Sequence, residues 1–338
     1  MPYELLIGLR YLRAKRKSTF ISIITFISTA GVALGVMALI VVLAVMTGFE
    51  EDLKDKILGT NADVVVLKSG GEIEDYAALM DRLKKVPGVT AATPFIYSQV
   101  MLSTGDNVSG VVLRGIDPGT DATVTNLKKS MVEGNLADLE VVAGSSPGKP
   151  GIVLGKELAK NLHLSLGDMV NVVSPLGTIT PFGMIPKMKQ FRVAGLFNTG
   201  MFEYDTTLAY VGLKEAQSFL SLGDAVTGIQ LKAEDVYKSD EIAQEINRSL
   251  GYDYFARDWM RMNKNILFAL KTEKMVMFII LTLIVLVAAF GIASTLFMVV
   301  MEKTKDIAIL KSMGATGRSI MKIFVLEGLI IGVAGTAI

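Results

Sequence analysis

Residues 20–46 read FISIITFISTAGVALGVMALIVVLAVM, an unbroken apolar stretch without a charged side chain. As an α-helix, with a rise of about 1.5 Å per residue, it reaches about 40 Å and exceeds the roughly 30 Å hydrocarbon core of a bilayer. It predicts a first membrane span over residues 20–47. The competing interpretation, a cleaved signal peptide, has an apolar core of only about 7 to 15 residues that ends in a small-residue cleavage site.

Charged residues on either side of this stretch indicate its direction across the membrane. Basic residues precede it and acidic residues follow it: Arg10, Arg13, Lys15, Arg16 and Lys17 before, and Glu50, Glu51 and Asp52 after. Lysine and arginine beside a span stay in the cytoplasm, so the N-terminus is expected inside and the chain beyond residue 47 outside. Residues 1–19 carry leucines at helical spacing and are expected to form a cytoplasmic amphipathic segment or a plain basic flank.

A second charge-free stretch, MVMFIILTLIVLVAAFGIASTLFMVVM at residues 275–301, predicts a second span over residues 273–301. Lys303, Lys305 and Lys311 follow it and place its end in the cytoplasm. Residues 319–338 are expected to be the start of a third span, in a longer natural chain that continues through a fourth. The pattern is that of a multi-pass membrane protein with residues 48–272 exported.

Residues 48–272 alternate β-rich runs with amphipathic segments, which is typical of an α+β domain. Strands are expected at 62–67, 96–102, 108–114, 168–173, 190–197, 206–211 and 226–231, and helices at 75–85, 152–162, 213–220, 235–250 and 259–274. A stretch rich in Gly, Ser, Pro and Asp at 117–151 is expected to be a surface loop leading to a second lobe. The predicted fold class is α-helical transmembrane spans plus a large extracytoplasmic α+β domain of two lobes.

Between two predicted strands lies SPLGTITPFGMIPK, residues 174–187, with three prolines and two glycines. Because proline lacks the N–H that a β-ladder needs, we expect a protruding hook loop without regular strand pairing. Its apolar side chains would be exposed, which usually marks an interaction site; alternatively, the loop folds back onto its own domain. The candidate hook residues are Pro175, Leu176, Gly177, Thr178, Ile179, Thr180, Pro181, Phe182, Gly183, Met184, Ile185 and Pro186.

Composition argues against several other functions. The 338 residues are 51% hydrophobic and 20% charged, values between those of a globular enzyme and of a pure helical bundle. The net charge of +1 provides no electrostatic attraction for a nucleic-acid partner. With no cysteine and a single histidine, His163, no metal site and no catalytic residue are expected. The sequence also contains no G-x-x-x-x-G-K-[ST], so this chain is not expected to bind ATP.

The segment after the second span, EKTKDIAILKSMGAT at residues 302–316, resembles the cytoplasmic coupling helix of a family of ABC-transporter membrane subunits that includes MacB, FtsX, LolC and LolE. Ile307, Ile309 and Leu310 are expected to face the cytoplasm and to need a partner groove, unless the segment caps its own spans. The resemblance assigns coupling to an ATPase subunit to Glu302, Lys303, Asp306, Ile307, Leu310, Met313 and Gly314.

Further motifs narrow the resemblance to the lipoprotein-releasing LolC/LolE branch: IGLRY at 7–11, VMTGFE at 45–50 and TPFGMIP at 180–186, the last most similar to LolC. The resemblance implies a MacB-like periplasmic core domain and a hook that binds the periplasmic carrier LolA. It also implies a lipoprotein cavity lined by Val42, Met46 and Phe49. Independently, Gly31 and Gly35 form a G-x-x-x-G in the first span and predict close packing against a partner span.

The resemblance implies a non-catalytic permease subunit in the bacterial inner membrane that helps to extract lipoproteins. Expected partners are LolD-like ATPase subunits that bind ATP and Mg²⁺, a second LolC/LolE-type subunit (paralogue or copy), a LolA-like carrier, lipoprotein substrates and the lipid bilayer, with no nucleic acid. One subunit combining the LolC and LolE roles is also compatible. The alternatives are a MacB-like efflux subunit and an FtsX-like regulator of a cell-wall hydrolase.

Overall fold

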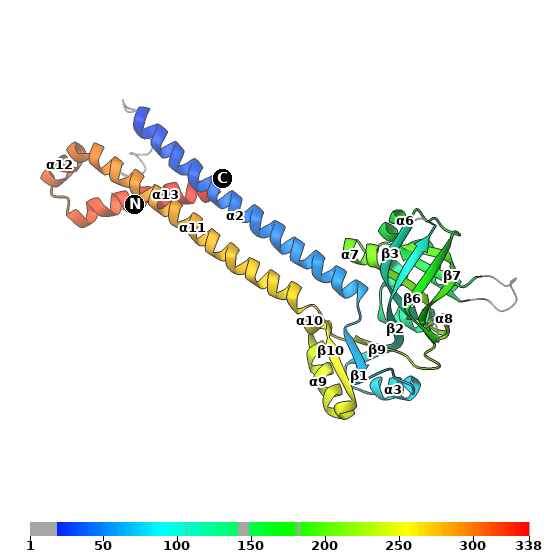
Figure 1. Ribbon diagram of the computed structural model, residues 1–338. Helices are drawn as coiled ribbons and strands as arrows, with labels where there is room; N and C mark the ends of the chain where they lie inside the picture. Colours follow the sequence, from blue (N-terminus) through cyan, green and yellow to red (C-terminus); the bar gives the residue numbers. More distant parts are fainter. Residues whose placement is uncertain (1–18, 106, 141–148, 181–182, 338) are drawn as a thin grey trace. The chain divides into compact units, whose positions relative to one another are not determined.

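The computed structural model describes residues 19–105, 107–140, 149–180 and 183–337 (Figure 1). The chain divides into two compact units, one made of Met1–Glu51 with Phe268–Ile338 and the other of Asp52–Leu267. The first unit is helical wherever it is described as regular structure, and the second contains all the described strands. Most of the predicted N-terminal segment, residues 1–18, lies outside the described residues.

Long apolar helices make up the first unit. They are α2 (Thr19–Thr60), α11 (Lys264–Glu302), the short α12 (Thr304–Ser312) and α13 (Gly317–Ala337). By length and apolar composition, α2, α11 and α13 are each able to cross a membrane. Polar residues extend α2 past the first apolar run to Thr60.

In the described ranges, ten strands form one hydrogen-bonded sheet in the second unit. The strands are β1 (Val64–Lys68), β2 (Val89–Thr104), β3 (Asn107–Ile116), β4 (Met131–Gly134), β5 (Gly151–Gly155), β6 (Met169–Thr180), β7 (Gly183–Phe197), β8 (Leu208–Gly212), β9 (Gly228–Ala233) and β10 (Tyr254–Asp258). The helices are α3 (Tyr76–Leu83), α4 (Pro118–Val124), α5 (Leu127–Ser130), α6 (Lys156–Asn161), α7 (Phe202–Thr207), α8 (Leu213–Leu220), α9 (Ser239–Leu250) and α10 (Trp259–Met262), with 3-10 turns η1 (Leu136–Leu139), η2 (Val236–Lys238) and η3 (Gly251–Asp253).

Strand pairing closes six of these strands into a ring. β2 pairs with β3, β3 with β8, β8 with β5, β5 with β7, β7 with β6, and β6 back with β2. The first part of β2, from Val89 to Phe95, pairs with β9, which together with β1 and β10 completes a four-stranded sheet. β2 therefore belongs to both parts and joins them through one continuous backbone.

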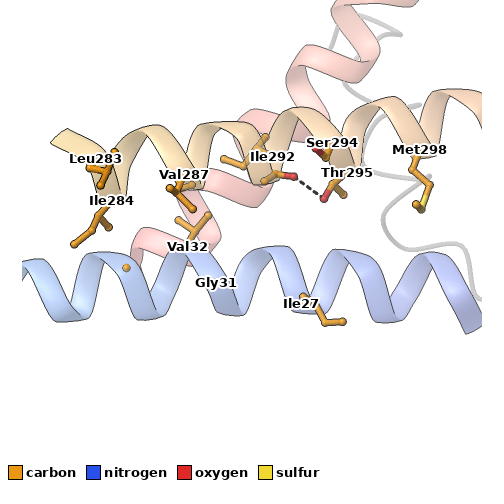
Figure 2. Close-up of a pocket in the computed structure, with 13 residues that line it drawn as sticks. Ile27, Gly31, Val32, Leu283, Ile284, Val287, Ile292, Ser294, Thr295 and Met298 are labelled. Carbon is orange, nitrogen blue, oxygen red and sulfur yellow. Dashed lines mark hydrogen bonds between the residues drawn. The ribbon is translucent and has the colours of Figure 1, made fainter. Parts of the chain in front are cut away.

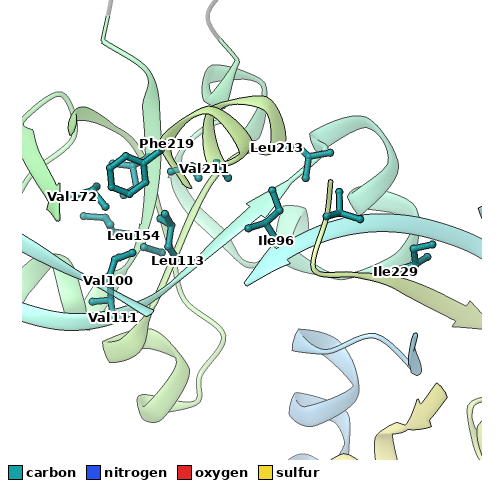
Figure 3. Close-up of a cluster of buried hydrophobic side chains, with 14 of the residues drawn as sticks. Ile96, Val100, Val111, Leu113, Leu154, Val172, Val211, Leu213, Phe219 and Ile229 are labelled. Carbon is teal, nitrogen blue, oxygen red and sulfur yellow. The ribbon is translucent and has the colours of Figure 1, made fainter. Parts of the chain in front are cut away.

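The main hydrophobic cluster consists of buried side chains from the strands of both parts and from the helices next to them (Figure 3). Along β2, buried Ile96, Val100 and Leu102 alternate with exposed Tyr97 and Met101, as expected for a strand with one face on the core. Helix α8 covers this core with Leu213, Ala216 and Phe219, and the Phe219 ring meets Phe191 edge to face, with centroids 6.3 Å apart. Shared apolar burial therefore stabilises both parts of the sheet.

Two local predictions differ from the structure. Residues 152–162 do not form one helix, because β5 occupies Gly151–Gly155 and α6 begins at Lys156. All five residues of β5 are buried between β7 and β8, and a short, continuously apolar run of this kind has no period that separates strand from helix. The strand expected at 206–211 begins only at Leu208, after α7.

The expected passage between lobes at residues 117–151 is also misplaced. This segment connects β3 with β5, which belong to the same ring, and it carries α4, α5, β4 and η1 rather than a plain loop. Residues 144–148 of its Gly- and Ser-rich part lie outside the described residues. The chain moves from the four-stranded sheet to the ring within β2 and returns between α8 and β9.

A buried aspartate ties the start of β1 to the neighbouring elements. The Asp63 carboxylate accepts a hydrogen bond from the Ala233 backbone N–H at 2.9 Å and forms an ion pair with Lys232 Nζ at 3.1 Å. Its backbone carbonyl accepts from the Trp259 N–H at 2.9 Å, at the point where β10 becomes α10. Asp63 is fully buried whereas the Lys232 side chain is 36% exposed, so the hydrogen bond to the backbone is the contact that water cannot replace.

Replacing Asp63 tests this role. Asp63→Ala leaves a buried N–H without its charged acceptor and is expected to destabilise the second unit by about 2–3 kcal/mol. The measurement is the urea concentration at which a protease cleaves the second unit of the full chain in detergent. Asp75→Ala, which removes the exposed cap of α3, serves as control and is expected to cost about 1 kcal/mol or less. Equal losses in the two variants would contradict the assignment.

Candidate functional site

The predicted hook is a β-hairpin made by β6 and β7. Regular pairing runs from Met169 opposite Arg192 to Ser174 opposite Lys187, and it resumes from Thr178 opposite Ile185. The expectation of no strand pairing is therefore wrong. Residues 175–177 face only Pro186, so two of the prolines fall in one irregularity of the ladder, where a missing N–H costs little. Of the predicted hook residues, Pro181 and Phe182 lie outside the described residues.

The base of this hairpin is held against α8. Lys189 Nζ on β7 lies 2.6 Å from Glu215 Oε2, and the Lys187 ammonium donates to the Ser221 hydroxyl just after α8. Pro175 and Pro186 are exposed. The side chain of Met188, on β7 beside this base, is also exposed. The contacts with α8 thus fix the base of the hairpin, and apolar groups are exposed next to this base.

In the first unit, α2 and α11 line an open apolar pocket of about 610 Å³ (Figure 2). Its lining residues are Ile27, Gly31, Val32 and Gly35 of α2 and Leu283, Ile284, Val287, Ala288, Gly291, Ile292, Ser294, Thr295 and Met298 of α11. The Thr295 hydroxyl donates to the Gly291 carbonyl at 2.9 Å, so this polar side chain is satisfied within its own helix. The pocket suits an apolar chain rather than a polar ligand.

The two glycines predicted to pack closely lie on the wall of this pocket. A Cβ on Gly35 would lie 3.6 Å from Ile284 Cγ2, whereas no described atom lies within 4 Å of the same position on Gly31. The tight contacts are instead in α13. A Cβ on Gly335 would lie 2.9 Å from the Thr29 carbonyl oxygen, and one on Gly328 would lie 2.8 Å from Leu296 Cδ1. The glycine-rich run GLIIGVAG at 328–335 is the sequence signal for these contacts.

The residues assigned to a lipoprotein cavity lie elsewhere on α2. Val42, Met46 and Phe49 are spaced by four and three residues and so share one helix face, but they do not line the pocket. Val42 and Phe49 are exposed, and Met46 is half-buried. On the turn that follows, Glu50 Oε2 binds Lys274 Nζ at 2.7 Å and links α2 to α11.

The predicted coupling segment forms the separate helix α12. Ile307 packs against the buried cluster of Val299, Ile320 and Phe324, so the expectation that it faces the cytoplasm is wrong. Two residues along a helix turn the side chain by about 200°, so Ile307 and Ile309 cannot share a face.

The exposed apolar side chains of this segment are Ile309, at 59%, and Met313, at 79%, while Leu310 is half-buried. Gly314, at φ +95, ends the helix in a left-handed conformation. Glu302 is exposed, and Lys303 and Asp306 form an ion pair at 3.2 Å.

The buried charged side chains of the second unit pack within its core. Arg114 lies over the rings of Phe95 and Tyr210, at 5.7 and 5.8 Å from their centroids. Burial raises the pKa of the nearby Asp121 carboxyl, although the Thr125 hydroxyl and the Arg114 guanidinium act in the opposite direction. These groups are enclosed and offer no access to a substrate.

The described residues give no support for a metal site or for a catalytic histidine. Exposed His163 has an amide neighbour, Asn107 Nδ2 at 3.2 Å, rather than a carboxylate. Within the described ranges, no cluster of three His, Cys, Asp or Glu residues is placed to hold a metal.

Comparison with known proteins identifies the family. Residues 25–249 match the MacB-like periplasmic core domain, and residues 278–338 match the FtsX-like permease C-terminal domain. The lipoprotein-releasing system transmembrane protein LolC of Xylella fastidiosa strain Temecula1 is 38% identical over 335 residues, covering 99% of this chain and 79% of the relative. The chain belongs to the LolC/LolE family.

Other relatives agree. LolC of Neisseria meningitidis serogroup B is 38% identical over 334 residues, covering 98% of this chain and 79% of the relative. LolE of Haemophilus influenzae is 29% identical over 343 residues, with the same two coverages. The predicted family and the predicted combination of apolar helices with a MacB-like α+β domain are confirmed.

The glycine contacts of α13 are open to test. Gly335→Ala places a Cβ against the Thr29 carbonyl and is expected to lower stability by about 1–3 kcal/mol through overpacking. Gly332→Ala meets no described atom within 4 Å and is expected to be neutral or stabilising, since alanine favours helix. The measurement is the thermal midpoint of the full chain in detergent. A decrease of the same size in both variants would contradict the close contact of α13 with α2.

Proposed function

We propose that this chain is a non-catalytic membrane subunit of an ATP-driven ABC transporter that releases lipoproteins from the bacterial inner membrane to a periplasmic carrier. The observation that carries this proposal is the 38% identity to a LolC over 99% of the chain. Extraction opposes about 0.8 kcal/mol per buried acyl methylene, so an energy source is required. Because the sequence has no P-loop, LolD-like subunits would bind ATP and Mg²⁺.

The proposed topology places the N-terminus and α12 in the cytoplasm and the second unit in the periplasm. Its support is the distribution of charge: basic residues precede the first apolar run and follow the second, while acidic residues come after the first. In this arrangement α12 faces the compartment that contains ATP, and the hook hairpin faces the compartment that contains a soluble carrier.

Within this proposal, α12 transmits force through two different faces. Ile309 and Met313, one helical turn apart and both exposed, are the anchors that dock into a groove of the ATPase subunit. Ile307, packed on Val299 and Phe324, fixes the helix to its own bundle. Docking on one face and packing on the other are what a rigid connection between the two subunits requires.

The proposed path of the cargo uses the apolar face of α2. Val42, Met46 and Phe49 would contact the acyl chains, and a second LolC/LolE-type subunit, a copy or a paralogue, would supply the opposite wall. The hook hairpin would then hold the LolA-like carrier. Two observations support this role of the hairpin. Lys189 and Glu215 anchor its base to α8, and exposed prolines lead into it.

The docking face of α12 gives the main test of the function. The double variant Ile309→Ala/Met313→Ala is expected to reduce lipoprotein release by about 30- to 1000-fold, because each truncated anchor removes about 1–2 kcal/mol of binding. Release is measured in proteoliposomes containing the ATPase subunit, together with co-purification of that subunit. Lys305→Ala, an exposed change on the same helix, is the control. Unchanged release in the double variant would exclude α12 as the coupling element.

The hook is tested by photo-crosslinking in intact cells. A crosslinker at Phe182 is expected to capture a small soluble periplasmic protein that holds acylated cargo. Tyr252, a fully exposed residue of η3, provides a matched control that should not capture it. Capture of a cell-wall hydrolase at Phe182 would favour the FtsX-like regulator, and capture of an outer-membrane duct component would favour the efflux subunit. Crosslinks only to this chain's own domain would remove the carrier-binding role.

A further inference from the structure

The pocket between α2 and α11 exists because small residues stand on the facing sides of the two helices. Gly31 of α2 and Ala288 and Gly291 of α11 all line it. A Cβ at Gly31 or Gly291 would meet no described atom within 4 Å, so either position is open to the pocket. Helix α13 contacts α2 at Val32, but none of its described residues is among those that line the pocket.

The pocket lies in those halves of the two apolar runs that adjoin basic residues. It extends over residues 27–35 of α2 and residues 283–298 of α11. Lys17 precedes the first apolar run, and Lys303 and Lys305 follow the second. In the topology proposed above, this is the cytoplasmic leaflet of the membrane. The three residues of α2 assigned to the cargo lie nearer to the opposite leaflet.

The dimensions of the pocket suit one extended chain. At about 1.5 Å per residue it covers about 12 Å of α2 and about 22 Å of α11, lengths that bracket the about 15 Å of one leaflet of hydrocarbon. Spread over these lengths, a volume of about 610 Å³ gives a mean cross-section of about 28–50 Å². A helix with its side chains is about 10–12 Å across, or about 80–110 Å², and is too wide to enter. A single file of methylenes is narrow enough.

The lining offers an acyl chain dispersion contacts and asks for no polar group. Figure 2 shows Val32 of α2 and Val287 of α11 pointing towards each other across the space between the helices. The Thr295 hydroxyl already bonds to its own helix. Because lipid tails are as apolar as these side chains, binding is favoured by filling a void whose walls otherwise lack contacts, rather than by removing apolar surface from water.

Charge at the basic end of the pocket indicates which lipid enters. Met298 lines this end, and Lys303 follows it by five residues, or about 7.5 Å along a helix. The headgroup layer on each side of a bilayer is about 5–7 Å thick, so this lysine and exposed Lys305 are at headgroup depth. Ammonium groups at this depth attract anionic headgroups.

We propose that this pocket binds one acyl chain of an anionic phospholipid of the cytoplasmic leaflet, with the end of the chain near Leu283 and the headgroup near Lys305. The proposal rests on the function proposed above, whose topology assigns the leaflet. The bound lipid is distinct from the cargo, because the acyl chains of a lipoprotein would contact α2 at residues 42–49. A phospholipid is thereby a fixed part of the contact between α2 and α11.

The test uses phosphatidylglycerol that carries a diazirine at the end of one acyl chain. The full chain, assembled with its ATPase and second membrane subunits, is placed in phosphatidylcholine liposomes with this probe, and labelled positions are found by mass spectrometry of peptides. We expect at least about fivefold more label at Leu283, Ile284 and Val287 than at Val285 and Leu286, which lie at the same depth, are exposed and do not line the pocket. Equal labelling would indicate ordinary surrounding lipid and would overturn the proposal.

Filling the pocket should exclude the probe. The double variant Gly31→Leu/Gly291→Leu is expected to reduce the label at the pocket positions at least about tenfold. Gly332→Leu, at an equally open position of α13, is the matched control and should leave the label unchanged. Undiminished label in the double variant would overturn the proposal. If the double variant does not fold, the comparison of positions in the unaltered chain still decides.

The headgroup and the leaflet are tested separately. The same diazirine on phosphatidylcholine should label the pocket several-fold less, and Lys305→Gln should reduce this difference; equal labelling by the two lipids would overturn the anionic preference. Since the chain has no cysteine, Lys305→Cys supplies a unique thiol for an impermeant maleimide. We expect reaction only after cells are permeabilised, and reaction in intact cells would overturn the assignment to the cytoplasmic leaflet.

Competition identifies other occupants. An excess of a triacylated lipopeptide should leave the label in the pocket unchanged, and its loss would make the pocket part of the cargo path and overturn the proposal. Label that is present in the chain alone but absent from the assembled complex would show that a second subunit covers the pocket, with the same consequence. If the docking variants of Ile309 and Met313 leave release intact while the pocket is labelled as expected, the proposed function fails and the lipid site stands.

Discussion

The hydrocarbon core of a membrane provides no hydrogen-bond partner for the backbone, and this limits the structures that its spanning segments can form. Spanning segments must pair their N–H and C=O groups internally, which makes α2, α11 and α13 helices before any packing is considered. Because lipid is as apolar as a leucine side chain, contact between these helices is not driven by the hydrophobic effect. It rests on close approach, which Gly328 and Gly335 supply, and on the Glu50–Lys274 ion pair.

In the second unit, backbone N–H and C=O groups are paired by closing strands into a ring. Six strands form a ring and so leave no free edges among themselves, while β10 remains at the end of the four-stranded sheet. Asn247 of α9 covers this edge: its amide accepts from the Ala256 N–H at 2.7 Å and donates to the Ala256 carbonyl at 3.1 Å. A side chain thereby takes the place of a neighbouring strand and blunts a surface that would otherwise pair with another chain.

In the helical unit, the exposed and the packed helix faces carry different side chains. The face of α12 that points away from the bundle carries Ile309 and Met313, and the face that points inward carries Ile307. Glu327 is an exception to the apolar composition of the packed helix faces, and it lies one turn beyond the cluster that anchors Ile307. Its Oε2 is the one buried carboxylate oxygen without a hydrogen-bond partner in the described part of that bundle.

The apolar helices, the α+β character of residues 48–272 and the family could all be predicted from the amino-acid sequence, because hydrophobic length, periodicity and the run after the second span are local properties. The folded chain was needed to reveal the closed ring, the strand identity of Gly151–Gly155 and the pairing on both sides of Pro186, since each depends on neighbours far along the chain. The same holds for the inward direction of Ile307 and for the close helix contact, which Gly335 makes rather than Gly31. A linear pattern gives the residues that share a face, but which face is covered is set by the element that packs on it.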